Sequence, residues 1–434
     1  MAPGEQGVSL PTAITLGNWQ DPPFNRSAFW QTRELLPTHR VGRGDGPVRD
    51  LPVGTSGADP MAVAVGRADG TEATVGDVMA DTYTDAYVVL QDGELVGEWY
   101  APQGGPDRPH ALMSVTKSVV GCVAGNLVEQ ELLETQRPVT DYVPELLGSG
   151  YAGASVRDVL DMRTGVRFRE DYTDPDAEFV ALDEWIGWRP ADTEEAPRGL
   201  YRYLATLGAD GSSGGNFRYR STDSDVLGWV CERAGSERMA NLMSALVWAP
   251  MGAETDADLL CDGVGTAVHD GGLAATARDL ARFGQLLLDN GSVPVADGEP
   301  RSVVPSRWLR QAWGVDSDLR TAFAATPTEL TFPGGWYRNQ FWFRPGEYGD
   351  VLLCLGIFGQ MVHVCRRTRT VCVKLSTWPK PQDPFFLYDT CAAFDAVGGA
   401  LAGRERSQGW RGLPGIVAGL SRAGGDEPTR DHGQ

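Results

Sequence analysis

The order of predicted secondary structure constrains this chain most, because strand-like segments lie near both ends of it and helical ones lie between them. Residues 86–90 and 95–99 flank Asp92-Gly93, a pair that favours the tight turn of a β-hairpin. Further short, apolar and β-branched segments come late in the chain, at 336–343, 351–358, 361–365 and 370–375. The sequence between has mostly helical periodicity, at 114–132, 156–162, 224–234, 236–248 and 277–288. This order predicts an α+β fold in which distant segments complete one antiparallel sheet, helices flank it, and a mostly helical lobe forms a cleft with it.

Three regions are expected along the chain. Residues 1–80 are rich in glycine, proline and aspartate, with one helical candidate at 25–36, and are predicted to form an N-terminal extension wrapping the core. Residues 81–403 are predicted to form the main domain, with the helical lobe at about 133–330 inserted in the α/β lobe and a closing amphipathic helix at 385–401. Residues 404–434 are polar and glycine-rich, and we expect a flexible tail.

Composition argues against several classes of partner. The net charge of −20, without a basic run, argues against a nucleic acid or an anionic membrane. No segment approaches the roughly 18 apolar residues of a membrane span, and the first ten residues lack the basic and apolar runs of a signal peptide. Seven scattered cysteines that do not cluster with the five histidines predict neither a disulfide framework nor a metal site. We therefore expect a cytoplasmic protein without a metal or cofactor.

Ser114-Val115-Thr116-Lys117, at the start of a helix with one apolar stripe, is the strongest local signal for chemistry. The i, i+3 spacing puts the hydroxyl and the amine on one helix face. A serine hydroxyl becomes a good nucleophile when a neighbour takes its proton, and lysine can do so if its surroundings lower its pKa. Only three of the 38 basic residues are lysine, which favours a role that arginine cannot perform. The alternative is a solvated serine and lysine on a surface helix.

Two later segments extend this candidate site. Tyr219, two residues before Ser221 and just ahead of a helix, is placed to relay a proton to a leaving group. The alternative is a buried structural tyrosine with one hydrogen bond, which is common in proteins. Ile357-Phe358-Gly359-Gln360 joins two predicted strands. A glycine there would let a substrate carbonyl approach, and the N–H of Gln360 with that of Ser114 would form an oxyanion hole. The alternative is a hairpin turn that contains glycine.

These motifs carry a family resemblance. Ser114-x-x-Lys117, Tyr219-x-Ser221 and Gly359, in this order, resemble the three motifs of class C β-lactamases, penicillin-binding proteins and related esterases. The chain is also similar, over roughly residues 16–403, to the 6-aminohexanoate-dimer hydrolases, the branch that degrades nylon oligomers. The similar stretches are 18–26, 110–125, 139–165, 168–190, 217–234, 271–284 and 356–379.

The resemblance implies a β-lactamase/transpeptidase-like fold and an acyl-enzyme reaction, without metal or cofactor, on a small-molecule amide or ester. Ser114 would attack the carbonyl, Lys117 and Tyr219 would move protons, and water would release the acyl group. Within the nylon branch, Tyr172 would meet the scissile amide and Asp183 a substrate ammonium. The other implied cleft residues are Trp185, Trp188, Ser221, His269, Ile357 and Gly359, against the alternatives of core tryptophans and a structural histidine.

The sequence departs from the β-lactamase motif at one place, which narrows the expected activity, and alternative functions stay open. β-Lactamases place a lysine or histidine and a small hydroxyl residue before the final glycine, where this chain has Ile357-Phe358. A β-lactam carboxylate therefore lacks its expected cation, and β-lactamase activity is not predicted. The alternatives to a linear-amide hydrolase are a broad carboxylesterase and a non-catalytic binding protein on the same fold. A homodimer is compatible with the sequence.

Overall fold

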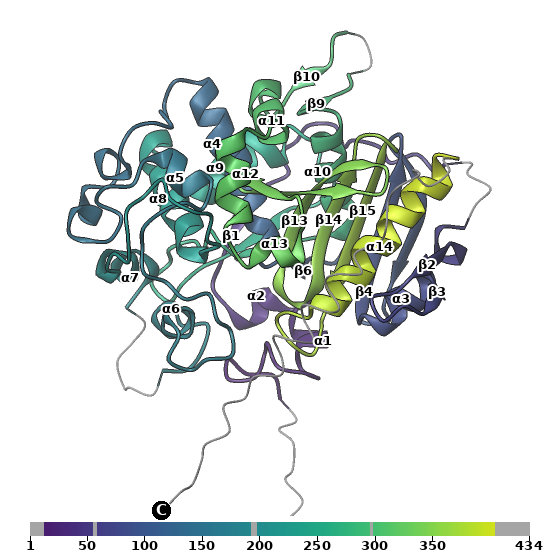
Figure 1. Cartoon of the computed structure of the whole chain (residues 1–434), viewed down its shortest axis with the longest axis horizontal. Coiled ribbons are helices and arrows are strands. Elements are labelled where there is room, and N and C mark those ends of the chain that lie inside the picture. Colours follow the sequence, from purple (N-terminus) through teal and green to yellow (C-terminus); the bar gives the residue numbers. More distant parts are fainter. Residues whose placement is uncertain (1–12, 55–58, 192–197, 296–297, 404–434) are drawn as a thin grey trace, which may run out of the picture.

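A seven-stranded antiparallel sheet forms the larger half of the molecule in the computed structural model, which describes residues 13–54, 59–191, 198–295 and 298–403 (Figure 1). Its strand order is β11-β12-β13-β14-β15-β4-β5. The strands are β4 (Thr84–Gln91), β5 (Glu94–Tyr100), β11 (Trp336–Arg338), β12 (Phe341–Gly346), β13 (Gly349–Gly356), β14 (Gln360–Cys365) and β15 (Thr370–Ser376). β15 pairs with β4 from Thr370 opposite Gln91 to Ser376 opposite Thr84. The predicted antiparallel sheet, completed by distant segments, is therefore confirmed.

Helices cover both faces of this sheet, which explains why its central strands are apolar throughout. Every residue of β14 and β15 is buried. α10 (Ala277–Leu288) packs against β15, β14 and β4, while α14 (Pro384–Leu401) and α3 (Val75–Asp81) pack together beside the other face (Figure 1). A Cβ at Gly284 would lie 2.4 Å from a methyl group of Val371, so glycine lets α10 approach the sheet closely.

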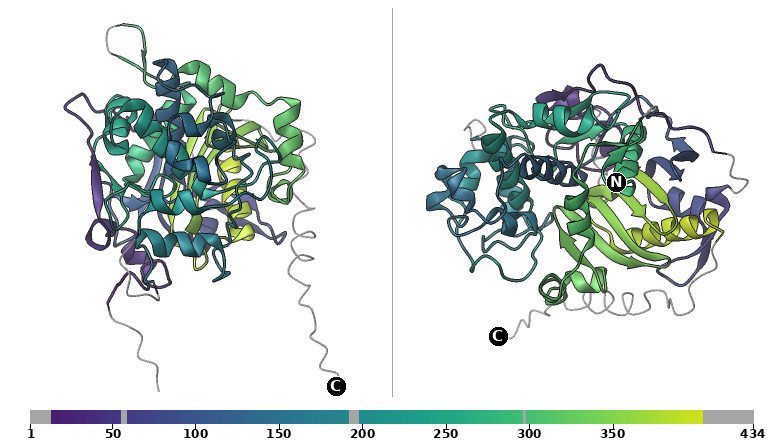
Figure 2. Two further views of the ribbon diagram at one scale, coloured as in Figure 1. Left: turned by 90° about the vertical axis from the view of Figure 1, so that its left-hand side faces the viewer. Right: turned by 90° about the horizontal axis from the view of Figure 1, so that it is seen from above.

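The helical lobe lies beside the sheet, with α4 (Val115–Glu129) between the two halves (Figure 2). Its helices include α5 (Val156–Leu160), α6 (Glu178–Ile186), α7 (Leu200–Thr206), α8 (Ser221–Gly235) and α9 (Met239–Met243), which continues as a π-helical turn, η4 (Ser244–Trp248). α11 (Ser306–Trp313), α12 (Ser317–Ala324) and α13 (Thr328–Thr331) follow near the β11 edge. The predicted range of 133–330 for this lobe needs correction, because α10 belongs to the layer on the sheet.

Residues 13–80 contribute to a second, four-stranded sheet and to the layer beside α14. The order of this sheet is β1-β7-β8-β6, with β1 (Thr38–Val41), β6 (His110–Ala111), β7 (Ala257–Leu260) and β8 (Leu273–Ala275). The short hairpin of β2 (Ala64–Gly66) and β3 (Glu72–Thr74) precedes α3. The predicted helix 25–36 is instead two single turns, α1 (Asn25–Ala28) and α2 (Thr32–Leu35). The chain leaves helical geometry at Gln31, just after the buried Phe29 and Trp30, whose rings pack against His110.

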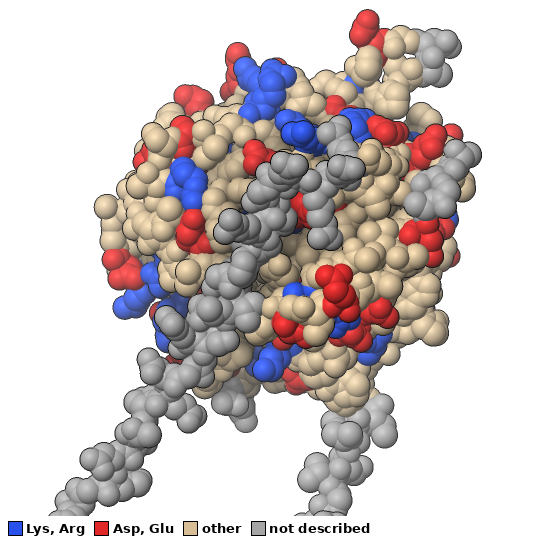
Figure 3. Space-filling model, turned by 45° about the vertical axis from the view of Figure 1, so that its right-hand side comes forward, with Lys and Arg blue, Asp and Glu red and all other residues tan. Residues whose placement is uncertain are grey.

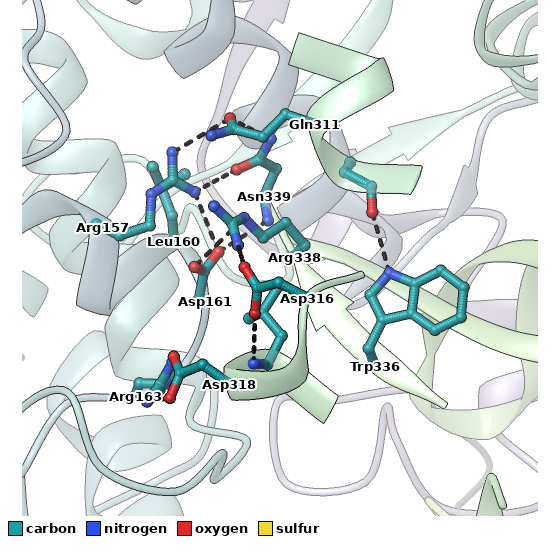
Figure 4. Close-up of polar contacts among 12 residues, drawn as sticks. Arg157, Leu160, Asp161, Arg163, Gln311, Asp316, Asp318, Trp336, Arg338 and Asn339 are labelled. Carbon is teal, nitrogen blue, oxygen red and sulfur yellow. Dashed lines mark hydrogen bonds and ion pairs between the residues drawn. The ribbon is translucent and has the colours of Figure 1, made fainter. Parts of the chain in front are cut away.

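A buried polar network joins the helical lobe to the sheet at the turn between β11 and β12 (Figure 4). Arg157 of α5 donates to the side chain of Asn339 and pairs with Asp161 at 3.2 Å. Asn339 and Gln340 have φ angles of 53° and 68°, in the left-handed region that non-glycine residues rarely adopt. Gln340 ties this turn to the helices, because its carbonyl accepts from Ser118 of α4 at 2.9 Å and its amide oxygen accepts from Ser224 of α8.

No helix in the described ranges is long and apolar enough to cross a membrane. The tail expected at 404–434 and the first ten residues considered for a signal lie outside the described residues, and the domain limits at residues 80 and 403 stay predictions.

Candidate active site

Ser114 is the N-cap residue of α4, at the junction of the two halves, and it follows a strained residue. Met113 has a φ of 48°, so the chain turns sharply between β6 and the helix. Two hydrogen bonds hold this turn: the Thr116 hydroxyl donates to the Met113 carbonyl at 2.7 Å and accepts from the N–H of Leu273 at 2.9 Å. Backbone strain of this kind persists only where the surroundings enforce it, and it clusters at active sites.

Lys117 lies one helical turn beyond Ser114 and is buried. Its amine donates to Ser114 Oγ at 2.7 Å, to Ser221 Oγ at 3.1 Å and to the carbonyl oxygen of Asp270 at 2.8 Å. Burial disfavours its charge, but the interactions with the acidic groups around it, Tyr219, Asp270, Glu170 and Asp225, outweigh burial and raise the pKa of Lys117. The pKa of Lys117 is therefore shifted in the direction opposite to the lowering that a lysine base requires.

Tyr219 lies in the loop that leads into α8 and faces Lys117. The amine lies 5.1 Å from the centre of its ring, and the other face of the phenol stacks on Trp342 with ring centres 5.2 Å apart. Burial raises the pKa of the Tyr219 hydroxyl, while the charge of Lys117 opposes that rise. A neutral phenol beside an ammonium can donate a proton to a leaving group.

Glu170 belongs to the same cluster, although nothing in the sequence pattern singled it out. Ser221 donates to it twice, from its hydroxyl at 2.6 Å and from its backbone N–H at 2.8 Å, and the Tyr172 hydroxyl donates at 2.8 Å. Burial raises the pKa of the Glu170 carboxyl, despite the opposing charge of Lys117. Hydrogen bonds thus run without a break from Ser114 through Lys117 and Ser221 to Glu170.

The segment Gly356–Gln360 forms the opposite wall of the site. A Cβ on Gly356 would lie 2.5 Å from the carbonyl oxygen of Leu112, so this glycine brings the end of β13 against the turn before Ser114. The amide side chain of Gln360 is fully engaged with the backbone of Ser376, which fixes the start of β14. In the described chain the N–H of Ser114 donates to no protein acceptor, whereas the next three N–H groups do.

The expected reason for Gly359 needs correction. Its φ of 91° requires glycine, and a Cβ there would lie 2.3 Å from the indole of Trp378. The absent side chain therefore makes room for Trp378 rather than for a substrate carbonyl. Gly359 still lines the cavity at Ser114, and so does the indole that it admits.

Two cavities meet at Ser114. The larger one, of about 350 Å³, is lined by Tyr219, Gly359 and Gln360 and otherwise mainly by apolar side chains. The smaller one, of about 20 Å³, reaches towards Asp183 and Asp270 and is also lined by Trp188 and Ser221. Tyr172 and Ile357 line both cavities and so lie at their junction.

Asp183 is the acidic end of the smaller cavity. One of its carboxylate oxygens is buried without a hydrogen-bond partner, and the guanidinium of Arg189 lies 3.8 Å away. Burial raises the pKa of Asp183 to about 7, and the nearby Arg189 only partly offsets this. A buried carboxylate oxygen without a hydrogen bond is costly unless a ligand satisfies it, so this atom, whose ion pair with Arg189 is long, suits an ammonium group.

Two of the expected cleft residues lie elsewhere. His269 lines neither cavity: it is buried against α8, where a Cβ on Gly228 would lie 2.1 Å from its ring, and its Nε2 lies 3.0 Å from the Tyr201 hydroxyl. Trp185 also lines neither cavity and packs against Tyr203 and Arg198. The resemblance implied that His269 and Trp185 line the cleft; in the structure both instead have structural roles.

No group of three or more His, Cys, Asp or Glu side chains in the described ranges is placed to hold a metal ion. The seven cysteines are all buried and free.

Comparison with known proteins identifies the family and the fold. The beta-lactamase family model matches residues 71–390. A 6-aminohexanoate-dimer hydrolase from Paenarthrobacter ureafaciens is 38% identical over 399 residues, which covers 88% of this chain and 95% of that protein. The chain is also similar in fold to a solved candidate 6-aminohexanoate-dimer hydrolase from Bacillus anthracis, with a TM-score of 0.81, 23% identity and coverage of 94% of this chain and 100% of that one.

A more distant solved structure, a family VIII carboxylesterase, gives a TM-score of 0.54 at 16% identity, over 74% of this chain and 96% of that one. This likeness concerns the fold alone. Together with the family match, it confirms the expected β-lactamase/transpeptidase-like fold. The chain belongs to the beta-lactamase family and is a serine hydrolase of amide or ester bonds.

Proposed function

We propose that the protein hydrolyses linear amides through an acyl-enzyme on Ser114, acting on a small molecule in the cytoplasm. The distance of 2.7 Å between Lys117 Nζ and Ser114 Oγ, with Tyr219 beside both, is the observation that carries this proposal. The relative from Paenarthrobacter ureafaciens is named as a hydrolase of 6-aminohexanoate dimer, whose two units are joined by an amide bond, and this supports the choice of bond. Free, buried cysteines suit a reducing compartment.

The first step would be attack of Ser114 Oγ on the substrate carbonyl. Because the pKa of Lys117 is raised, we take its amine as protonated before attack, so the serine proton must enter the hydrogen-bonded cluster as a whole. Lys117 can pass a proton through Ser221 to Glu170 and take the proton of Ser114 in exchange. The raised pKa of Glu170 makes this carboxylate a better acceptor than an ordinary glutamate.

The charge that develops on the carbonyl oxygen would be stabilised by backbone donors. We assign these to the N–H groups of Ser114 and Gln360, because both residues line the larger cavity. Tyr219 would then donate its proton to the departing amine, and the resulting phenolate would be stabilised by the Lys117 ammonium. Water would release the acyl group by the reverse sequence of proton transfers.

The acyl half of the substrate would extend towards the smaller cavity, whose volume of about 20 Å³ admits a group of the size of an ammonium but not the whole chain. Its buried acidic end at Asp183 suits a substrate with a terminal ammonium, and Trp188 forms part of its wall. Tyr172, at the junction of the cavities, is placed to meet the scissile amide.

The surface supports a small-molecule substrate rather than nucleic acid. On the face shown in Figure 3, lysine and arginine side chains are interspersed with acidic ones, and the whole chain carries a net charge of −20.

A second candidate, a broad carboxylesterase, is favoured by the mostly apolar lining of the 350 Å³ cavity, which would accept many alcohols. An ester differs from an amide in lacking an N–H, so relative rates on matched amides and esters separate the two candidates.

The test is covalent labelling of the purified protein by a fluorophosphonate, together with hydrolysis of 6-aminohexanoate linear dimer and of p-nitrophenyl esters. We expect labelling and turnover in the wild type and in Ser306→Ala, a control at a half-buried serine of α11 that does not line either cavity, and neither in Ser114→Ala. Labelling with ester turnover but no amide cleavage would move the function to a carboxylesterase. Absence of labelling would contradict the mechanism and favour a non-catalytic binding protein.

A further inference from the structure

The position of Tyr219 decides which half of a substrate enters which cavity. The proton donor to the leaving group must touch the leaving atom, and Tyr219 lines the larger cavity but not the smaller one. The leaving amine or alcohol therefore extends into the larger cavity, and the acyl chain extends towards Asp183. Tyr172 lines both cavities, as expected for a residue at the scissile bond.

The larger cavity offers the leaving half a wide apolar surface. Its volume of about 350 Å³ falls within the range of ordinary small-molecule pockets. Side chains from β12, β13 and β14, from the end of α13, from the segment after β15 and from α14 form the walls: Trp342, Leu355, Met361, Phe332, Trp378 and Leu387. Apolar area removed from water is the main source of binding energy for a leaving half of this kind.

The charge of this cavity has one sign. Asp383 is the one charged side chain among its described lining residues, which include no lysine or arginine. One of its carboxylate oxygens accepts from the N–H groups of Phe385 and Phe386, both at 3.0 Å, and so caps α14. These bonds hold the carboxylate in place at the cavity wall, where it repels a second anion.

We propose that the natural leaving half is uncharged and apolar, and that a carboxylate on this half is selected against. This inference rests on the proposed amide hydrolysis and specifies its substrate class: a linear amide with an amino group on its acyl half and a neutral, apolar amine as leaving group. Two elements would discriminate between leaving groups: Asp383 repels a carboxylate, and the aromatic walls bind an apolar chain. Linear dimer, whose leaving half ends in a carboxylate, would then be cleaved well below the rate of its neutral analogues.

The experiment compares kcat/KM for three amides that share the 6-aminohexanoyl group. Their leaving amines are 6-aminohexanoate, its carboxamide and hexylamine. The carboxamide is nearly isosteric with the carboxylate, so this pair isolates charge, and hexylamine against the carboxamide isolates apolar contact. We expect a preference of about tenfold or more for the carboxamide over the carboxylate, and a further gain for hexylamine.

Asp383→Asn removes the charge and keeps a good helix cap, and it should narrow the ratio of carboxamide to carboxylate. Asp316→Asn changes another helix-capping aspartate, at α12, which does not line the cavity, and it should leave the ratio as in the wild type. Equal or faster cleavage of the carboxylate, or a ratio insensitive to Asp383→Asn, would overturn the inference.

A comparison of esters distinguishes failure of the proposed amide hydrolysis from failure of this inference about the leaving half. If no amide is cleaved but Ser114 is labelled, hexyl hexanoate and 5-carboxypentyl hexanoate repeat the comparison with esters. A preference for the neutral ester that Asp383→Asn reduces would uphold the assignment of the leaving half while refuting the amide substrate. Lack of serine-dependent cleavage of either bond would overturn both proposals.

Discussion

The hydroxyl of Tyr172 donates to Glu170 across a distance of 2.8 Å, so its oxygen meets the junction of the two cavities as a hydrogen-bond acceptor. An amide N–H is a donor that this oxygen can accept, and an ester has no equivalent group. The bond between Tyr172 and Glu170 thus orients a residue that can distinguish the two kinds of substrate.

Tyr172→Phe should reduce kcat/KM for an amide by about tenfold or more, because the scissile N–H then loses a partner in a desolvated site. An ester with the same acyl group should lose much less, so the ratio of the two rates is the measured quantity. Tyr203→Phe is the matched control, since the hydroxyl of Tyr203 donates to the carbonyl of Glu178 and its ring lines neither cavity. Equal losses for amide and ester would show that Tyr172 does not contact the scissile N–H.

Glu170 should set the acidic limb of the pH profile. The carboxylate can take a proton only when it is ionised, which requires a pH above its pKa, and burial raises that pKa above the usual range of glutamate. Activity on esters and amides should therefore fall as the pH decreases through this raised value. In Glu170→Gln, kcat/KM should fall for both substrates and this limb should disappear, whereas Glu237→Gln, at an exposed turn, should keep the wild-type profile. A profile that is unchanged by Glu170→Gln would remove Glu170 from the proton pathway.

Asp183 should make the binding of amine-bearing substrates depend on pH near neutrality. Its pKa is raised to about 7, so the carboxylate is ionised above that pH and becomes protonated as the pH falls through it. The attraction for a substrate ammonium is lost on protonation, and KM for 6-aminohexanoyl substrates should rise below about pH 7. A hexanoyl analogue without the amino group provides the control, because its KM has no such dependence. Asp183→Asn should raise the KM of the amine substrate at pH 8 and make it independent of pH; a KM that still rises would place the ammonium elsewhere.

The large sheet could be predicted because its signals are local or repetitive: a turn pair at Asp92-Gly93 and short apolar strands on both sides of a helical region. The second sheet could not, since β6 and β8 have only two and three residues and leave no period to detect. Amphipathic periodicity correctly marked α10 as a helix but carried no information about its partner. The range predicted for the helical lobe, 133–330, therefore includes α10, although this helix packs on the large sheet.

Part of the catalytic cluster could also be predicted, because two of its residues are close together in the sequence. Ser114 and Lys117 are three residues apart on one helix, so their contact follows from helix geometry. Glu170 meets Ser221 across 51 residues, and Asp270 offers Lys117 its backbone carbonyl, which no side-chain pattern reveals. His269 and Trp185 lie close in sequence to cavity residues but face away from the cavities, and the sequence alone does not give this orientation.

Gly121→Ala tests how firmly the catalytic helix is held by the turn between β11 and β12. A Cβ at Gly121 would lie 2.5 Å from the carbonyl oxygen of Asn339 and 3.0 Å from the Cβ of Gln340, both in a turn with left-handed φ angles. Backbone must shift to admit the methyl group, which should lower the free energy of unfolding by about 1–3 kcal/mol. Because α4 carries Ser114 and Lys117, kcat should fall as well, beyond the loss expected from the unfolded fraction. Gly148→Ala is the control, since nothing lies within 4 Å of its Cβ position. Denaturant titration and kcat measured on both variants give the result, and wild-type stability in Gly121→Ala would show that α4 can move away from the turn at no cost.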